Sequence, residues 1–264
     1  EFKSSQVDLD GLGMNNIFSF PKPVYLIQYI ARGFLQESDL ILDFFAGSGT
    51  TAHAVMQLNK EDGGNRRFIC VQMPEPCEEK SEAYKAGYNT IADIAKERIR
   101  RTGKKIQQEI AEENRKNKEK LDFDKSNEDI KLDTGFKVFK LSASNFKQWR
   151  QSRLHNSQEL IDQLKLFIDP IAENAIIEDM VYELLLKSGK DLNSRVENND
   201  GYYLIDGNEL AFILEKVNEK IIMEVLSEYP KKVIALDRIF YGNDQLKTYP
   251  ALQMKDAGVE FKTI

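Results

Sequence analysis

The chain has 264 residues, of which 41% are hydrophobic and 30% are charged, and its formal net charge is -6. A chain of this length can bury a substantial core, and no apolar run is long enough to cross a bilayer. Two cysteines and two histidines are too few for a disulfide framework or a zinc site. We therefore expect a soluble protein of two folded units, without a membrane segment or a metal.

The first predicted element is a helix that follows Pro21 and Pro23. Apolar side chains recur three and four positions apart after these prolines, at Val24, Ile27, Ile30, Ala31 and Phe34. This spacing is typical of a helix that buries one face, and proline is favoured in a first helical turn.

Residues 40–52 combine an apolar strand, a glycine turn and the start of a helix, with Asp43 at the strand's end. Gly47 and Gly49 allow positive φ angles and a close approach of the backbone to a ligand. The helix that begins at Thr50 offers unpaired N–H groups to an anion. We therefore interpret this segment as a cofactor-binding turn.

The flanking residues discriminate among cofactors. A triphosphate-binding loop needs a lysine after its last glycine, where Thr50 stands. A dinucleotide fingerprint is matched by Gly47, Gly49 and Ala52, followed by a second strand at 67–73. Two glycines and an alanine recur by chance, so an NAD-dependent enzyme stays the weaker alternative.

Residues 43–51 resemble the D-x-F-x-G-x-G signature of S-adenosylmethionine-dependent DNA amino-methyltransferases. The order of a Pro-Lys-Pro helix before the glycine strand is similar to the class in which the cofactor half follows the catalytic half. Further segments resemble the Mod subunits of type III restriction–modification systems, namely 66–76, 80–88, 91–101, 135–141, 144–146 and 242–248. The resemblance implies an α/β fold: a partial Rossmann-like class I methyltransferase domain, the cofactor half, followed by a small α/β C-terminal domain.

The resemblance also indicates how the turn would bind S-adenosylmethionine. The backbone of the turn would line the methionine and ribose, and Asp43 would accept from the ammonium group. Thr50 and Thr51, with Lys22 as an ally, would receive the carboxylate. Gln72 and Glu75 are alternatives for the ribose hydroxyls. The complete set of expected cofactor-binding residues is Lys22, Asp43, Phe45, Ala46, Gly47, Ser48, Gly49, Thr50, Thr51, Gln72 and Glu75.

The catalytic tetrapeptide of the family, [ND]-P-P-[YFW], is absent, and the nearest text is Asp169-Pro170-Ile171. That tetrapeptide holds the flipped adenine. We therefore expect the C-terminal portion of an adenine-N6 DNA methyltransferase, with no catalytic residue of its own and inactive alone. The resemblance implies a bacterial cytoplasmic protein that meets DNA through the full-length protein, a second Mod subunit and a restriction subunit. A non-catalytic assembly module is the alternative.

The sequence from residue 90 onward predicts a long helix, then a domain boundary, then a second folded unit. Thr90 and Asp93 form a capping box, and the basic residues between 96 and 120 indicate a solvated helix face rather than a DNA-binding stripe. Residues 1–110 then form the cofactor half, 111–133 a charged helix end or linker, and 134–264 the C-terminal domain.

The second unit shows no catalytic group of residues. Its predicted strands lie at 202–205, 211–214, 233–236 and 259–261, and its predicted helices near 157–166, 171–187, from 217, and 244–256. A further predicted strand at 136–141 either belongs to this unit or completes the cofactor sheet as its third strand. Turn residues and a helix cap explain one polar group as well as a ligand site would, namely Asp237, Asn243, Asp244 and Lys247. We interpret Trp149 as a half-buried aromatic residue of a helix.

Overall fold

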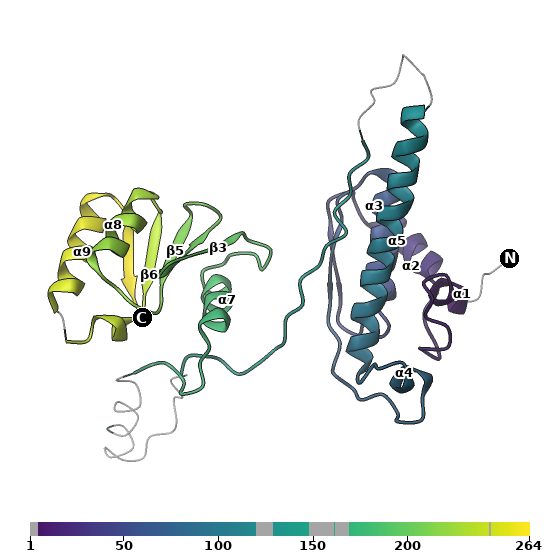
Figure 1. The fold of residues 1–264 in the computed structure, drawn as a ribbon, viewed down its shortest axis with the longest axis horizontal. Coiled ribbons are helices and arrows are strands. Elements are labelled where there is room, and N and C mark those ends of the chain that lie inside the picture. The colour runs from purple at the N-terminus through teal and green to yellow at the C-terminus, as the bar shows by residue number, and fades with distance from the viewer. Residues whose placement is uncertain (1–4, 120–128, 148–160, 162–168, 243) are drawn as a thin grey trace. The chain divides into compact units, whose positions relative to one another are not determined.

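A computed structural model describes residues 5–119, 129–147, 161, 169–242 and 244–264 (Figure 1). The chain is a mixed α/β protein that divides into two compact units, Glu1–Phe136 and Lys137–Ile264. Neither unit contains, in its described part, a helix with the length and apolar composition needed to cross a membrane.

The first unit is built on two parallel strands, β1 (Leu40–Asp43) and β2 (Arg67–Cys70), joined by helix α3 (Thr50–Asp62). Their register pairs Leu40 with Arg67 and Asp43 with Cys70. The other helices of the unit are α1 (Ser5–Asp10), α2 (Val24–Phe34), α4 (Glu82–Lys85) and α5 (Ile91–Glu119). Helix α3 packs against α2, α5 and β2, so it lies at the centre of the unit.

Helix α5 begins as predicted and extends to Glu119, into the stretch 111–133 for which the sequence allowed a charged helix end or a linker. The N–H of Thr90 donates to the carboxylate of Asp93 at 3.0 Å and the N–H of Asp93 donates back to the Thr90 hydroxyl at 3.2 Å, which confirms the capping box. Gly103 does not break the helix. A Cβ at this glycine would lie 3.1 Å from the carbonyl oxygen of Thr134, so the missing side chain makes room for the chain that returns along α5.

The returning segment, residues 130–136, belongs to the first unit. Leu132 and Phe136 pack against the buried cluster that α3 and α5 form, and the Nε2 of Gln107 donates to the Leu132 carbonyl at 2.7 Å. The first compact unit therefore extends to Phe136. The predicted strand at 136–141 is wrong, because these residues are extended without a pairing partner in the described chain.

Helix α2 buries less of its apolar face than its spacing predicted. Val24 and Ala31 are buried, but Ile30 is 48% exposed and Phe34 is 83% exposed. Pro23 lies at the N-cap, and the first helical N–H, that of Val24, donates to the carboxylate of Asp8 at 2.9 Å. Helix α1 therefore caps α2.

One face of the β1–β2 pair is not covered. Phe68 and Cys70 point into the cluster with α3 and α5, whereas Leu42 and Ile69 on the opposite face are 58% and 46% exposed. Parallel strands are normally covered on both faces. The first unit thus presents an apolar sheet surface.

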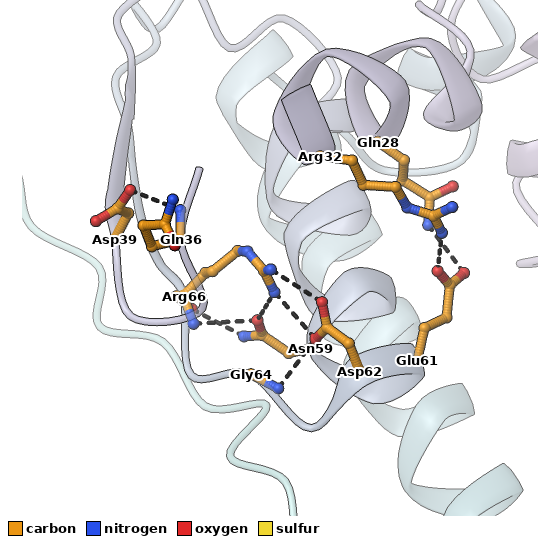
Figure 2. Close-up of polar contacts among 9 residues, drawn as sticks. All are labelled: Gln28, Arg32, Gln36, Asp39, Asn59, Glu61, Asp62, Gly64 and Arg66. Carbon is orange, nitrogen blue, oxygen red and sulfur yellow. Dashed lines mark hydrogen bonds and ion pairs between the residues drawn. The ribbon is translucent and has the colours of Figure 1, made fainter. Parts of the chain in front are cut away.

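A polar clamp fixes the connection from α3 to β2 (Figure 2). The Asn59 side chain accepts from the N–H of Arg66 at 3.0 Å and donates to its carbonyl at 2.8 Å. The buried Arg66 guanidinium donates twice to Asp62, at 3.0 and 2.9 Å. On the exposed side of the same helix, Glu61 accepts from Gln28 and Arg32 and joins α3 to α2.

The second unit contains a five-stranded sheet in the order β3-β4-β5-β6-β7. The strands are Val196–Asn199, Tyr202–Ile205, Leu210–Ile213, Lys232–Ala235 and Glu260–Thr263. The first three are antiparallel, and β5, β6 and β7 are parallel. Helix α7 (Ile177–Lys187) packs on one face, while α8 (Glu219–Ser227) and α9 (Asp244–Asp256) pack on the other, with the 3-10 helix η1 (Asp237–Phe240) after β6.

Most predicted elements of this unit are present. Strand β3 was not predicted, since Glu197, Asn198 and Asn199 give it no apolar alternation. Helix α7 starts six residues later than the predicted residue 171, where the Ile171 N–H donates to the Asp169 carboxylate in a local turn. The predicted helix at 157–166 falls mainly outside the described residues, as do Trp149 and Asn243.

Replacing Asn59 with alanine should destabilise the first unit by about 2 kcal/mol, because two buried backbone groups of Arg66 lose their partners. Glu61→Ala on the same helix removes only exposed contacts and should cost less than about 0.5 kcal/mol. Thermal unfolding of both variants measures the difference. Equal costs would show that the clamp does not stabilise the connection.

The second unit should lose stability in acid through Glu183. Burial alone would raise the pKa of this carboxyl, but hydrogen bonds from Lys187, Ser144 and Asn145 lower the pKa from 4.5 to about 2. A carboxyl with a lowered folded-state pKa stabilises the fold above its unfolded pKa and loses this contribution as the pH falls. Glu183→Gln should therefore reduce the dependence of unfolding on pH between 4.5 and 2. An unchanged slope would contradict this assignment.

Candidate cofactor-binding site

The glycine turn lies at the carboxyl ends of β1 and β2, where open α/β sheets bind ligands. The N–H of Val71 donates to the Asp43 carbonyl at 2.7 Å, and the N–H of Ala46 donates to the Val71 carbonyl at 3.1 Å. These bonds hold the turn against the chain that leaves β2. The position matches the prediction from the sequence.

Asp43 joins the turn to the helix that follows it. One carboxylate oxygen accepts from the N–H of Phe45 at 3.1 Å, and the other accepts from the Thr51 hydroxyl at 2.5 Å. Asp43 is half-buried, so its oxygens can accept a further hydrogen bond from the open side.

The two glycines have different roles. Both adopt positive φ, 53° at Gly47 and 77° at Gly49. A Cβ at Gly49 would lie 3.3 Å from the carbonyl oxygen of Ala95, so this glycine lets α5 pack against the turn. A Cβ at Gly47 would meet nothing closer than Phe18 at 3.8 Å, so Gly47 borders open space.

Gln72 braces the turn. Its side-chain oxygen accepts from the N–H of Gly47 at 2.8 Å, and its Nε2 donates to the Met73 carbonyl at 3.2 Å. Glu75 has an exposed side chain, and its carbonyl accepts from the N–H of Ile91 at 2.9 Å. The oxygen of Gln72 is therefore engaged within the protein, whereas the Glu75 side chain extends into solvent.

The N-terminus of α3 keeps free donors. Within the described residues, the N–H groups of Thr50, Thr51 and Ala52 have no hydrogen-bond partner. The Thr50 hydroxyl donates to the carbonyl of Lys22 at 3.3 Å, while the Lys22 side chain is exposed. This end of the helix therefore favours an anion.

A hollow of about 340 Å³ lies beside the turn, lined by Ile27, Ile41, Leu42, Asp43, Phe44, Phe45 and Thr51. Three of these residues, Asp43, Phe45 and Thr51, are among the expected cofactor-binding residues. The lining is mainly apolar, and Phe45 is 80% exposed at its rim. Such a surface suits an aromatic or aliphatic ligand group with one polar anchor.

Arg98 was not identified from the sequence as part of this site. The sequence placed it on a solvated basic face, but the structure buries it completely beneath the turn. Its Nη1 donates to the hydroxyls of Ser48 and Thr50 at 2.8 and 2.7 Å, and its Nε donates to the Nδ1 of His53 at 3.4 Å. The signal was available, since Arg98 lies four residues after Ile94 on the buried stripe of α5.

His53 is neutral at working pH. Burial, followed by the charges of Arg98 and Lys105, lowers its pKa from 6.5 to about 3. Its Nδ1 can therefore accept from Arg98. Burial and the Asp43 charge raise the pKa of the Cys70 thiol to about 12, so this cysteine is an inert core residue.

Other candidate residues form no comparable site. In the second unit, the carboxylate of Asp237 pairs with Lys247 at 2.5 Å, and Asp244 begins helix α9. No cluster of three or more potential metal ligands among His, Cys, Asp and Glu occurs in the described ranges.

The family model for DNA methylases matches residues 3–83, which include the turn. The EcoP15I Mod subunit of Escherichia coli is 30% identical over 251 residues, which is 91% of this chain and 34% of that protein. The StyLTI Mod subunit of Salmonella typhimurium is 48% identical over 106 residues, 40% of this chain and 16% of that protein.

The type II methyltransferase M.KpnI of Klebsiella pneumoniae is 42% identical over 85 residues, 32% of this chain and 20% of that protein. The chain thus spans from 16% to 34% of the length of these relatives. The StyLTI and EcoP15I proteins are both Mod subunits of type III restriction–modification enzymes, and the EcoP15I match extends over both units of this chain. Over 91% of its length the chain is therefore similar to a Mod subunit of a type III restriction–modification enzyme, and its residues 3–83 match the DNA methylase family.

Proposed function

We propose that the first unit is the Rossmann-like cofactor half of an adenine-N6 DNA methyltransferase and that it binds S-adenosylmethionine at the glycine turn. The observation that carries this proposal is the turn itself: Asp43 at the end of β1, two glycines with positive φ, and free N–H groups at the start of α3. This turn lies within the residues matched by the DNA methylase family.

The residues around the turn suggest the placement of the cofactor. The N-terminus of α3 would hold the carboxylate, and Asp43 would accept from the ammonium group. The adenosine would lie on the apolar hollow next to Phe45. Because the oxygen of Gln72 is bonded to Gly47, Glu75 is the better placed of the two to reach the ribose hydroxyls.

Methyl transfer would need a segment that this sequence does not contain. Adenine's amine is a weak nucleophile and must be held next to the sulfonium, which the absent tetrapeptide would do. The uncovered apolar face of β1 and β2 supports the same interpretation, because a parallel sheet is stable when further structure covers it. The active enzyme would then combine this unit with a catalytic segment.

The second unit supports an additional role in assembly. It has its own core on both sheet faces, and the similarity to the EcoP15I Mod subunit extends through it. We propose that it contributes to contacts with a second Mod subunit or with a restriction subunit in the bacterial cytoplasm, while DNA meets the full-length protein.

The chain should bind S-adenosylhomocysteine and S-adenosylmethionine, and it should not bind NAD. Isothermal titration calorimetry with the three ligands measures this. Gly47→Val should abolish binding, because the side chain would occupy the open space beside the turn and a β-branched residue resists positive φ. Gly33→Ala in α2 is the control, since its Cβ would meet nothing within 4 Å. Preference for NAD would refute the methyltransferase proposal.

The isolated chain should transfer no methyl group to DNA. With tritiated S-adenosylmethionine and duplex DNA, no methyladenine is expected, because no residue set in the sequence can hold the flipped base. Adding a polypeptide that carries an [ND]-P-P-[YFW] segment from a related Mod subunit should restore transfer. Methyladenine formed by the purified chain alone would show that another residue set is catalytic.

A further inference from the structure

Arg98 carries a buried charge for which the described residues supply no hydrogen-bonded carboxylate. Its side chain is fully buried, and all its partners are neutral: Ser48, Thr50 and His53. Its Nη2 has no partner at all in the described chain. Burial lowers the pKa of Arg98 to about 10, with Asp8 opposing this shift, so the guanidinium remains charged at neutral pH.

The carboxylate of Asp8 is already engaged elsewhere, because it accepts from the N–H of Val24 at the start of α2. A buried guanidinium without an ion-pair partner is costly. Such a cost is retained in a folded protein where the charge serves a purpose, and perturbed buried charges concentrate at functional sites.

The charge lies where the N-terminus of α3 is also positive. Nη1 bonds the first residue of this helix, Thr50, and the residue before its N-cap, Ser48. The helix adds the partial positive charge of its free N–H groups. The Arg98 guanidinium and the positive end of α3 repel each other, and an anion bound at the turn would reduce this repulsion by attracting both.

The same bonds orient the hydroxyls. The Thr50 oxygen accepts from Arg98 and its proton goes to the Lys22 carbonyl. The Ser48 oxygen also accepts from Arg98, which leaves its own proton available as a donor. A carboxylate at the turn could therefore receive the Ser48 hydroxyl and the free N–H groups of Thr50 and Thr51.

We propose that Arg98 is a specificity-determining positioning residue that, together with the N-terminus of α3, makes the turn select ligands that carry an amino-acid carboxylate. This inference rests on the proposed cofactor. It adds that the selection comes from a residue beneath the turn that does not itself touch the ligand.

The test compares two ligands that share the adenosine and thioether groups. S-adenosylhomocysteine has the amino-acid carboxylate, and 5′-methylthioadenosine lacks it. Arg98→Met should weaken S-adenosylhomocysteine binding at least about tenfold, the loss expected for a charged interaction, and should change 5′-methylthioadenosine binding less than about twofold. Arg98→Lys keeps the charge and should retain most of the selectivity.

Arg98→Gln separates charge from hydrogen bonding, because its amide can still donate to Ser48 and Thr50. It should behave like Arg98→Met in ligand selectivity. Circular dichroism and thermal unfolding check that each variant is folded. Arg100→Met on the exposed side of α5 is the matched control and should leave both affinities unchanged, because the Arg100 side chain is 56% exposed and pairs with the neighbouring Glu97.

Three outcomes would overturn the inference. An equal loss for both ligands would assign Arg98 to the shape of the turn alone, and no loss for either would leave it without a role. Failure of both neutral variants to fold would assign it to the fold alone. If the unmodified chain binds neither ligand, the proposed cofactor itself is wrong, and this outcome is distinct from the other three.

Discussion

The contact between the glycine turn and helix α5 is the constraint on which the first unit depends. Gly49 can lie against Ala95 because neither residue carries a large side chain, and Arg98, one turn further along α5, bonds the hydroxyls on either side of that glycine. The turn is therefore shaped from below by a helix that starts 42 residues after it, as well as by its own glycines. Asp43 and Gln72 fix it from the side of the sheet. A ligand that binds there meets a preorganised backbone.

A cofactor site needs a rigid backbone and also open groups that can contact the ligand, and the two faces of the turn meet these two needs separately. The face of the turn towards α5 is closed and buried, with Ser48 and Thr50 bonded to Arg98, while the face towards the hollow carries the exposed aromatic rings of Phe44 and Phe45. Interactions that position a binding group contribute most when their own geometry is fixed beforehand. The uncovered face of β1 and β2 lies beside this open side and gives the unit a second surface with unused binding capacity.

The glycine turn, its strand and its helix, and the start of α5, could be predicted because their chemistry is local: positive φ favours glycine, and the capping box of α5 lies within four residues. The burial of Arg98 was missed although it lies four residues after Ile94 on the buried stripe of α5, because a basic residue among Lys96, Arg100 and Arg101 follows the charge pattern of a solvated face. The chain at 136–141 was mistaken for a strand, since Phe136 and Val138, separated by Lys137, give alternation without a neighbouring strand to pair with in the described residues. Strand β3 was missed because its polar sequence shows no apolar alternation, and backbone pairing with β4 alone places it in the sheet.

Gly103 has a consequence for how the protein can be divided. The notch that it leaves in α5 accommodates Thr134, and the same segment brings Leu132 and Phe136 onto Ile106 and Ile110. A chain cut at residue 110, where the charge pattern changes, would lose this cover and expose an apolar stripe along its last helix. Soluble production of the first unit by itself therefore requires the sequence as far as Phe136, and a bulky residue at 103 would have the effect of the truncation without shortening the chain.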